Sequence, residues 1–319
     1  MPVLDQIEKI NGDTTLIDIG MFGVSKIAGV YLLQGEKKCL IDSGSQKEAK
    51  RLIKALTSLD AFPPDIIILT HAHYDHAQGV PSLLREAEKQ GKKIEVMASS
   101  LAIPLLADAS YNEPFNKGPY ESIENVTPIE EGDLVDLGGQ GLEIYSTPGH
   151  CSEHIALLDR QNGHLFAGDA PGYYWNSTRS YVPHFMPPSW NPELFSSSLD
   201  KLKNLQYEKL CLAHYGVLNR QEALDFLGRA EEYCTAWWEL FEKNEDKLDQ
   251  PAELLAEIMN TIKPVGPEQK ILSPKLKMMF AVLVAGKKLT GKKPPDLTEL
   301  LLLGILGDLV SGYRTYKQP

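Results

Sequence analysis

The chain has 319 residues, of which 43% are hydrophobic and 24% charged, enough to build the core of one large domain or two smaller ones. Its net charge of −11 repels phosphate backbones, so nucleic acid is excluded as an expected partner. We expect no membrane segment either, because the longest apolar run, Leu300 to Val310, contains Asp308 and is too short to span a bilayer. The first residues carry no apolar stretch of a secretory signal and the four cysteines form no closely spaced pair, so we expect a cytoplasmic protein.

Strand-like and helix-like segments alternate through the first 215 residues. Short β-branched runs are typical of buried strands, whereas apolar residues at helical spacing indicate helices. The predicted strands are Thr15–Ile19, Gly29–Leu33, Cys39–Ile41, Ile66–Leu69, Ile94–Ala98, Leu142–Ser146, His154–Leu158, His164–Ala167 and Lys209–Ala213. The predicted helices are Gln46–Leu59, Gln78–Gln90, Ser99–Asp108 and Pro192–Asn204. Two stretches that contain several prolines, Tyr111 to Gly132 and Pro171 to Pro192, are predicted to be long loops.

The character of the sequence changes after Gly216, where no further strand pattern is found. Four helices are predicted in this part of the chain, and they cover Asn219–Lys243, Pro251–Ile262, Ser273–Lys288 and Thr298–Tyr316. Asn219 is a suitable N-cap for the first of them. We therefore expect one unit over residues 1–216 and an all-helical segment over residues 217–319.

The most informative motif is T-H-A-H-Y-D-H-A-Q-G, which carries His71, His73, Asp75 and His76. Three of the chain's eight histidines therefore fall within six positions, beside a carboxylate. Imidazoles and carboxylates are common ligands of metal ions in proteins. The motif directly follows Asp65–Thr70, an apolar stretch typical of a buried strand, which would hold the ligands rigidly at one end of a sheet. We expect a metal site here rather than a surface cluster of histidines.

The spacing of these four residues favours two metal ions over one. A single ion would struggle to bind Asp75 and its neighbour His76 together with His71 and His73. Two ions roughly 3.5–4 Å apart could divide the four side chains between them.

Three later polar residues occupy the same structural context, since each follows a short strand. His150 follows Tyr145–Gly149, Asp169 ends the run from His164, and His214 ends the run from Leu210. Pro148 and Gly149 break their strand and allow the imidazole of His150 to turn inward. A carboxylate can bridge two cations through its two oxygens, which a neutral imidazole cannot do. The shared context makes all three residues candidate ligands of the same site.

Together these motifs resemble the metallo-β-lactamase superfamily. H-x-H-x-D-H at 71–76, T-P-G-H at 147–150, G-D at 168–169 and A-H-Y-G at 213–216 follow the order of that family, and the resemblance covers roughly residues 10–216. It implies an α/β fold, namely an αββα sandwich with a two-metal site on one edge. The all-helical C-terminal segment lies outside the resemblance and is expected to cap the site.

The resemblance also implies a role for each ligand. The first metal would be held by His71, His73 and His150, the second by Asp75, His76 and His214, and Asp169 would bridge the two. Zinc is the expected divalent ion, with iron or manganese as alternatives. The I-D-S-G motif at 41–44 places Asp42 beside a ligand histidine, as a partner that orients it. His154 lies four residues after His150 and is expected to support the site, whereas His164 opens a strand and is expected to be structural.

Such a site favours hydrolysis, because a water shared by two metals becomes a hydroxide near neutral pH. Asp75 is expected to orient this hydroxide and to carry a proton to the leaving group. In similar lactonases a tyrosine after the bridging aspartate contacts the substrate carbonyl, which points to Tyr173, although D-A-P-G-Y here is one residue longer than the lactonase D-A-x-Y. Tyr215 is the alternative. Cys151 has no base of its own and is not expected to act as a nucleophile.

The predicted substrate is a small ester, thioester or lactone. Its acyl part is expected to be apolar or aromatic, because the loop from Tyr173 to Pro188 is rich in aromatic residues and is expected to lie over the metals. Alternatively, this loop only packs against the helical tail, and similar tails occur in glyoxalase II and in the quinolone-signal response thioesterases. His184, in the same loop, is either a substrate contact or a surface residue. A homodimer is an open alternative to a monomer.

Two other functions stay open at this point. An oxidoreductase similar to the persulfide dioxygenases would use H-x-H-x-D-H with a single iron. A regulator would keep the site only to bind a small ligand. Two metals per chain together with turnover of a lactone or thioester would support hydrolysis, whereas one iron and oxygen consumption on a persulfide would exclude it. A ribonuclease is disfavoured by the acidic charge and by the lack of a basic arm.

Overall fold

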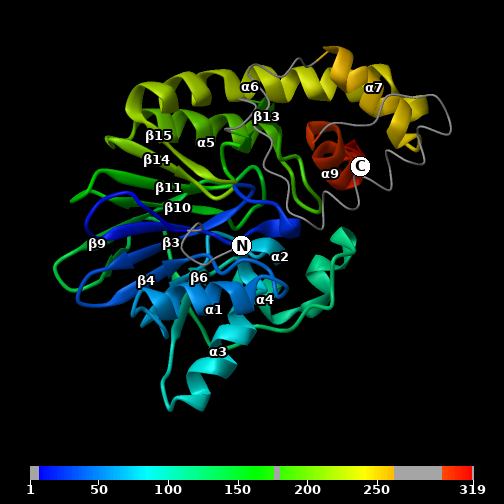
Figure 1. Cartoon of the computed structure of the whole chain (residues 1–319). Coiled ribbons are helices and arrows are strands. Elements are labelled where there is room, and N and C mark those ends of the chain that lie inside the picture. Colours follow the sequence, from blue (N-terminus) through cyan, green and yellow to red (C-terminus); the bar gives the residue numbers. More distant parts are fainter. Residues whose placement is uncertain (1–6, 176–179, 262–296, 318–319) are drawn as a thin grey trace.

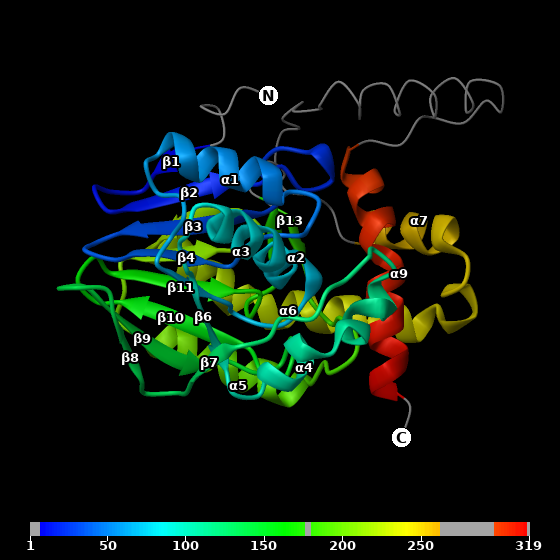
Figure 2. The same cartoon turned by 90° about the horizontal axis from the view of Figure 1, so that it is seen from below.

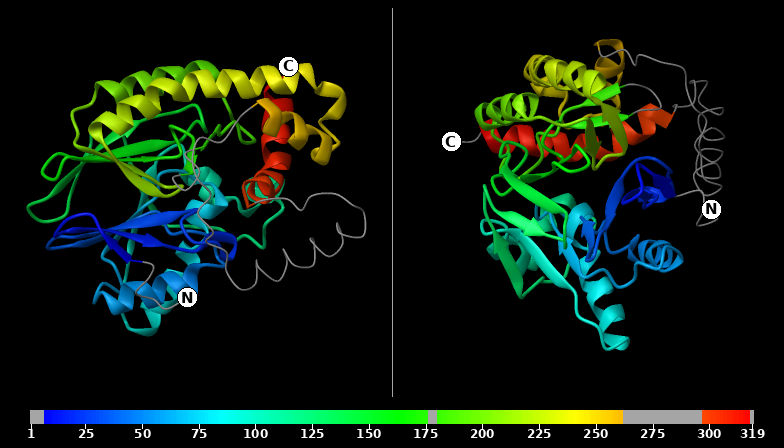
Figure 3. Two further views of the ribbon diagram at one scale, coloured as in Figure 1. Left: turned by 45° about the horizontal axis from the view of Figure 1, so that its top comes forward. Right: turned by 90° about the vertical axis from the view of Figure 1, so that its left-hand side faces the viewer.

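The computed structural model of the chain describes residues 7–175, 180–261 and 297–317. Two sheets pack face to face, and helices cover the outer face of each, which gives an αββα sandwich (Figure 1). The two sheets appear as separate layers in the right-hand view of Figure 3. The predicted fold class is therefore confirmed. The helix predicted over Ser273–Lys288 lies outside the described residues.

The first sheet has seven strands in the order of the sequence. They are β1 (Ile7–Lys9), β2 (Thr14–Asp18), β3 (Gly29–Gln34), β4 (Lys38–Ile41), β5 (Ile66–Ile68), β6 (Glu95–Ser99) and β7 (Val126–Ile129). The strands from β1 to β4 pair antiparallel, and those from β4 to β7 pair parallel. The connecting helices are α1 (Ala49–Ser58), α2 (Tyr74–Ala77), α3 (Val80–Lys89) and α4 (Ile103–Ala107), with the 3₁₀ helices η2 (Met21–Gly23) and η3 (Ala109–Phe115).

The second sheet has six strands in the order β15-β14-β11-β10-β9-β8. Their bounds are β8 (Leu134–Asp136), β9 (Gly141–Ser146), β10 (Ile155–Asp159), β11 (His164–Gly168), β14 (Lys209–Leu212) and β15 (Gly216–Asn219). Only β11 and β14 pair parallel in this sheet. A separate hairpin is formed by β12 (Tyr173–Trp175) and β13 (Ser180–Val182). Helices α5 (Pro192–Asn204) and α6 (Arg220–Lys243) cover the outer face of this sheet (Figure 1).

The all-apolar strand β5 shows why these sequences form buried strands. Ile66 and Ile68 pack in the core between the two sheets, where Leu157 and Phe166 of the second sheet also lie. Ile67 faces the other side and packs in the core that includes Leu52 of α1. A strand covered on both faces needs apolar residues at every position, because successive side chains point to opposite faces.

The structure adds six short strands to the predicted ones, namely β1, β7, β8, β12, β13 and β15. The stretch from Tyr111 to Gly132 contains part of η3 and all of β7, and the stretch from Pro171 to Pro192 contains the β12–β13 hairpin. Strand β7 is an edge strand and includes Pro128, a residue that favours loops in sequence and is tolerated at sheet edges. Strands β8 and β15 have three and four residues, too few for a visible alternation of apolar residues.

Strand β15 also changes the organisation expected after Gly216. Tyr215 adopts a left-handed φ of 67° and reverses the chain, so that β15 pairs antiparallel with β14. The second sheet therefore continues to Asn219, past the boundary expected near residue 217. Asn219 then caps α6 as predicted, since its side chain accepts a hydrogen bond from the Glu222 N–H at 3.0 Å.

The helices after α6 form a layer at one end of the sandwich. They are η4 (Glu245–Lys247), α7 (Pro251–Thr261) and α9 (Leu297–Lys317), and α9 contacts both α6 and α7 (Figure 2). Tyr313 of α9 packs against Trp238 and Phe241 of α6. Among the described helices, none is long and apolar enough to cross a bilayer.

Candidate metal centre

All seven predicted ligands lie together where strands of both sheets end. His71 follows β5, and His73, Asp75 and His76 lie at the start of α2 or within it. The second sheet supplies the other three from the loop after β9, the end of β11 and the end of β14, namely His150, Asp169 and His214. All are buried except Asp75, which is partly exposed. Rigid strands therefore aim the seven side chains at one small volume.

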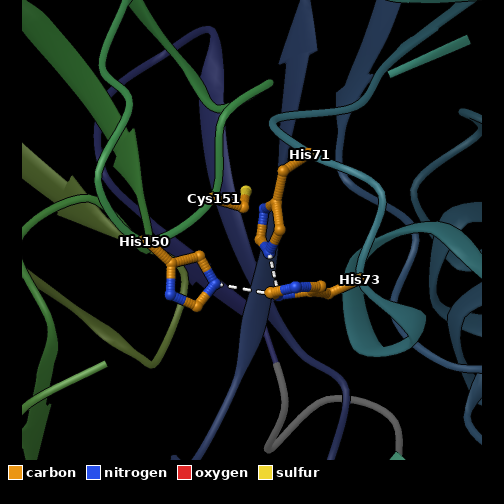
Figure 4. Close-up of side chains that lie close together, drawn as sticks. All are labelled: His71, His73, His150 and Cys151. Atoms are coloured by element: carbon orange, nitrogen blue, oxygen red, sulfur yellow. Dashed lines mark hydrogen bonds between the residues drawn. The ribbon is translucent and has the colours of Figure 1, made fainter. Parts of the chain in front are cut away.

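Three imidazoles form the first ligand group (Figure 4). His71 Nε2 lies 3.0 Å from His73 Nδ1, and His150 Nε2 lies 2.9 Å from the same atom. Burial lowers the pKa of all three imidazoles, so that they are neutral at physiological pH. Three neutral nitrogens that converge in this way offer the donor set that Zn²⁺ and similar ions prefer.

A second group is formed by Asp75, His76 and His214. His76 Nε2 lies 4.0 Å from Asp75 Oδ1, and His214 Nε2 lies 3.6 Å from Asp75 Oδ2. The ligand atoms of these three residues lie within 4.8 Å of one another, close enough to surround one ion. Asp75 adds a negative charge to this group, which the first group lacks.

Asp169 stands between the two groups. Its Oδ2 lies 3.3 Å from both His76 Nε2 and His214 Nε2 in the second group, and 3.6 Å from His150 Nε2 in the first. Burial alone would raise the pKa of this carboxyl, but the neighbouring histidines, His214 and His76 above all, hold it well below its usual range. The carboxylate is therefore charged and occupies a bridging position.

The polar atoms of the site fit a bound cation. Among the described residues, several buried atoms of this cluster have no hydrogen-bonding partner: His73 Nε2, His76 Nε2, Asp169 Oδ1, and both ring nitrogens of His214. Buried polar groups nearly always have hydrogen-bonding partners, so a cluster of buried polar atoms without partners requires an explanation. Divalent ions would satisfy the orphaned atoms that point into the cluster, and they would also offset the charge of the two carboxylates.

Asp42 orients one ligand histidine, His76, as predicted, and it also reaches His71 through Thr70. Its Oδ2 lies 2.8 Å from His76 Nδ1, and Oδ1 accepts a hydrogen bond from the Thr70 N–H at 2.8 Å. The Thr70 hydroxyl lies 3.0 Å from both Asp42 oxygens and 3.0 Å from His71 Nδ1. When His76 Nδ1 and His71 Nδ1 donate to these oxygens, the Nε2 lone pairs point to the site. Asp42 itself adopts a left-handed φ of 61° at the end of β4.

His154 supports the site without joining either ligand group, again as predicted. The Asp169 N–H donates to His154 Nε2 at 3.0 Å, so Nδ1 carries the proton and donates to the Thr147 hydroxyl at 2.8 Å. Burial lowers the pKa of His154 to about 3, which keeps the ring neutral. His164 lies elsewhere, with Nδ1 at 3.2 Å from the Thr14 hydroxyl, which agrees with a structural role.

His184 lies against the centre, and the sequence left it open as either a substrate contact or a surface residue. The alternative that it lies on the surface is wrong, because the side chain is fully buried against the centre. Its main-chain carbonyl accepts a hydrogen bond from His150 Nδ1 at 2.9 Å, and its own Nδ1 donates to the Asp169 carbonyl at 3.1 Å. His184 therefore fixes the ring of His150. Only its proximity in the fold shows this, since the strand before it, β13, was not predicted and His184 belongs to no motif.

The structure separates the two candidate tyrosines. The Tyr173 ring packs edge-on against His214, with centroids 3.8 Å apart, and it lines the cavity in front of the ligands. The Tyr215 hydroxyl instead lies 3.4 Å from Glu8 Oε2, and Tyr215 does not line that cavity. Tyr215 is therefore not the phenol beside the centre. Burial, together with Asp75 and Asp169, raises the pKa of Tyr173 well above its usual value, so its hydroxyl is a hydrogen-bond donor.

Cys151 lies next to His150 but is not an activated nucleophile. Its thiol lies beside His71 in Figure 4. Burial and the charge of Glu153 raise its pKa well above the usual value, so it is a protonated thiol at neutral pH. This agrees with the expectation drawn from the sequence.

The cavity in front of the ligands has a volume of about 40 Å³, more than the roughly 10–15 Å³ that a single water needs. Its lining is Met21, Phe22, Ile27, His73, Tyr74, Asp75, Phe115, His150, Asp169, Tyr173, Met186, His214, Ile305 and Asp308. Apart from the ligands, this lining is mostly apolar or aromatic. The last two residues belong to α9, so the helical tail forms part of the wall.

Comparison with known proteins places this geometry in a family. A sequence model described as the metallo-beta-lactamase superfamily matches residues 28–214, which include all seven candidate ligands. The chain belongs to this superfamily. Metallo-beta-lactamase members are mostly metal-dependent hydrolases, and the candidate ligand groups of this chain agree with that chemistry.

Individual relatives of this metallo-beta-lactamase superfamily member are distant. The protein ST1585 of Sulfurisphaera tokodaii, named as metallo-beta-lactamase fold-containing, is 28% identical over 64% of this chain and 78% of its own length. Its crystal structure covers 95% of this chain and 98% of its own, with a TM-score of 0.59. A hydroxyacylglutathione hydrolase of Legionella pneumophila is 34% identical over 46% of this chain and 44% of its own length. The structure of TTHA1623 in a di-iron-bound form is 25% identical and covers 64% of this chain and 93% of its own, with a TM-score of 0.50.

Proposed function

We propose that the chain is a two-metal hydrolase of small esters, thioesters or lactones. The observation that carries this proposal is the position of Asp169 Oδ2, which lies 3.3 Å from His76 Nε2 in one ligand group and 3.6 Å from His150 Nε2 in the other. A carboxylate that lies between two groups of metal ligands would bridge two cations. The likeness to a hydroxyacylglutathione hydrolase supports hydrolysis of a thioester, although it covers 46% of this chain.

The residues of the site fit the chemistry of hydrolysis. Bound divalent ions would supply Lewis acidity, which lowers the pKa of water toward ~7 and polarises a carbonyl. Asp75 would orient the attacking water, accept its proton and deliver that proton to the leaving group. The phenol of Tyr173 would donate a hydrogen bond to the substrate carbonyl or to the leaving oxygen. The apolar lining of the cavity would exclude bulk water and receive an apolar acyl part.

The identity of the ions is part of the proposal. The imidazole and carboxylate ligands of the centre suit zinc, iron and manganese alike. Zinc is our proposed ion, and the di-iron form of TTHA1623 is the reason to measure iron beside it. Elemental analysis of the purified protein distinguishes these metals directly.

The test combines metal analysis with a small substrate panel. We expect about two divalent ions per chain and turnover of at least one lactone, thioester or aryl ester. His71→Ala should abolish turnover and lower metal occupancy, because it removes a buried nitrogen of the first group. His164→Ala is the matched control, since His164 is an equally buried histidine outside the ligand groups.

Two results would overturn the proposal. One is a His71→Ala variant that keeps wild-type turnover. The other is a protein with a single iron that consumes oxygen on a persulfide and hydrolyses nothing in the panel, which would favour the dioxygenase chemistry instead.

A further inference from the structure

Helix α9 brings one carboxylate to the wall of the cavity. Asp308 and Ile305 lie one turn apart on α9 and both line the space in front of the ligands. The remaining wall outside the ligand set is made of apolar and aromatic side chains such as Ile27 and Phe115, and none of the described residues that line it is a lysine or arginine. Within the described part of the chain, Asp308 is therefore the one charged group of this lining that does not belong to the proposed metal centre.

The contacts of Asp308 leave it able to bind a ligand. Its nearest basic partner in the described part of the chain is Lys117, whose Nζ lies 3.9 Å from Oδ2, beyond the length of a hydrogen bond. The Asp308 side chain is 15% exposed and Lys117 is 29% exposed, so the carboxylate lies deeper than its partner. Because this ion pair is long, the Asp308 oxygens can still accept hydrogen bonds from a ligand.

We propose that Asp308 selects the substrate by charge, and that the preferred substrate carries an ammonium or a similar hydrogen-bond donor on its apolar chain. This inference rests on the proposed hydrolase function and names the substrate class of the same site. A ligand ammonium placed beside Asp308 would find a poorly hydrated acceptor at the apolar wall, whereas a ligand carboxylate in the same place would meet a like charge. Glutathione thioesters, which carry two carboxylates, would then be poor substrates.

The charge of Asp308 at neutral pH agrees with this role. Burial raises the pKa of Asp308 to about 6, with a further contribution from the charge of Asp75, while Lys117 lowers it. The carboxyl group is therefore mostly ionised in an assay slightly above neutral pH.

Three phenyl esters of equal chain length test the inference: those of 6-aminohexanoic acid, hexanoic acid and adipic acid, with ammonium, methyl and carboxylate ends. For the metal-loaded full chain we expect kcat/KM for the ammonium ester to exceed that for the neutral ester by about tenfold, the effect of a charge-assisted hydrogen bond. The carboxylate ester should be the slowest of the three. In Asp308→Asn the ratio between the ammonium and neutral esters should fall to near one.

Two further variants separate charge recognition from a loss of folding. Asp249→Asn removes an exposed carboxylate that pairs with Arg314 of α9 outside the cavity, so it should keep the wild-type ratio. Lys117→Met removes the competing cation and should increase the preference for the ammonium ester. Because each readout is a ratio of two substrates on one protein, incomplete folding or metal loading cancels.

A binding experiment keeps this inference separate from the proposed function. The anilides of the same three acids resist hydrolysis, and their dissociation constants can be measured by calorimetry whether or not the esters turn over. If no ester is hydrolysed, the hydrolase proposal fails, while tighter binding of the ammonium anilide that disappears in Asp308→Asn would still support charge selection. Equal turnover of the ammonium and neutral esters by the wild type, or an unchanged ratio in Asp308→Asn, would overturn the role of Asp308.

Discussion

Tyr173 is the side chain whose contribution to the reaction can be isolated most cleanly. Replacement by phenylalanine keeps the ring that packs against His214 and removes only the hydroxyl. Loss of one hydrogen bond to a developing oxyanion typically costs about 10²–10³-fold in kcat. We expect Tyr173→Phe to lower kcat by about 10²-fold with little change in KM, measured on the best ester of the panel with the metal content determined in parallel.

Tyr215→Phe is the matched control for this prediction. Tyr215 is also a buried tyrosine with a raised pKa, but its hydroxyl faces Glu8 rather than the cavity. We expect its kcat to stay within about twofold of the wild type. A Tyr173→Phe variant as active as Tyr215→Phe would show that the phenol takes no part in catalysis.

At the scale of single residues, the sequence predicted the site residues that lie in a motif or directly after a strand. The seven ligands could be named because each follows a strand or lies in one dense motif, and strand ends meet at the edge of a sheet. Asp42 could be named from the I-D-S-G motif and His154 from its spacing to His150, both through the family resemblance. His184 could not, because its contacts with His150 and Asp169 arise from a loop that crosses the centre and leaves no periodic signal.

The turn at the end of β11 sets the position of the bridging carboxylate. Gly168 adopts a left-handed φ of 51°, and a Cβ there would lie 2.5 Å from His154 Nε2, the atom that binds the Asp169 N–H. Both the backbone strain and the collision oppose any side chain at this position. A residue held in such a strained conformation costs about 1–3 kcal/mol.

We therefore expect Gly168→Ala to lower the free energy of unfolding by at least about 1–3 kcal/mol and to weaken metal binding, because Asp169 must shift. Chemical denaturation in the presence of a chelator measures the first effect, and metal titration measures the second. Gly228→Ala serves as the control, since Gly228 lies within α6 and an added Cβ there would meet no atom within 4 Å. Alanine should stabilise the helix at that position by up to about 1 kcal/mol. Equal stability of the two variants would contradict this account of the turn.

At the scale of elements, the long and periodic segments were predicted well and the short edge strands were not. Pro192–Asn204 was predicted with the bounds that the structure gives to α5. Strand β7 was missed because a proline interrupts it at an edge, and β15 because four residues after a reversed turn show no alternation. The helix predicted over Gln78–Gln90 begins at Val80 in the structure. A separate short helix, α2, precedes it and ends at Ala77. Pairing with neighbouring strands, rather than local propensity, creates the missed elements.

At the scale of the whole molecule, the helical tail and the sandwich meet at the cavity. The left-hand view of Figure 3 shows α9, drawn in red, at one end of the sandwich. Helix α9 supplies two cavity residues but none of the seven candidate ligands. The sequence pattern predicted the helix, and the segment was expected to cap the site, but the sequence did not show which of its residues would reach the cavity. We infer that the two parts have separate roles: the sandwich holds the metal centre, and the helical tail selects the substrate.

If the two parts have these separate roles, α9 can be displaced without loss of the bound metal. Gly312 lies where α9 crosses the loop after β13, and a Cβ there would lie 1.9 Å from the Phe185 carbonyl oxygen. Because this neighbour is backbone and cannot move aside, Gly312→Val should push α9 away and cost about 1–3 kcal/mol of stability. We expect metal occupancy to stay at the wild-type level while the charge preference between the ammonium and neutral esters is lost.

Gly307→Val on the same helix, where no atom lies within 4 Å of the added Cβ, should keep both properties. Loss of metal from Gly312→Val but not from Gly307→Val would show instead that the tail supports the centre itself, because only a docked α9 would then hold the ligands in place.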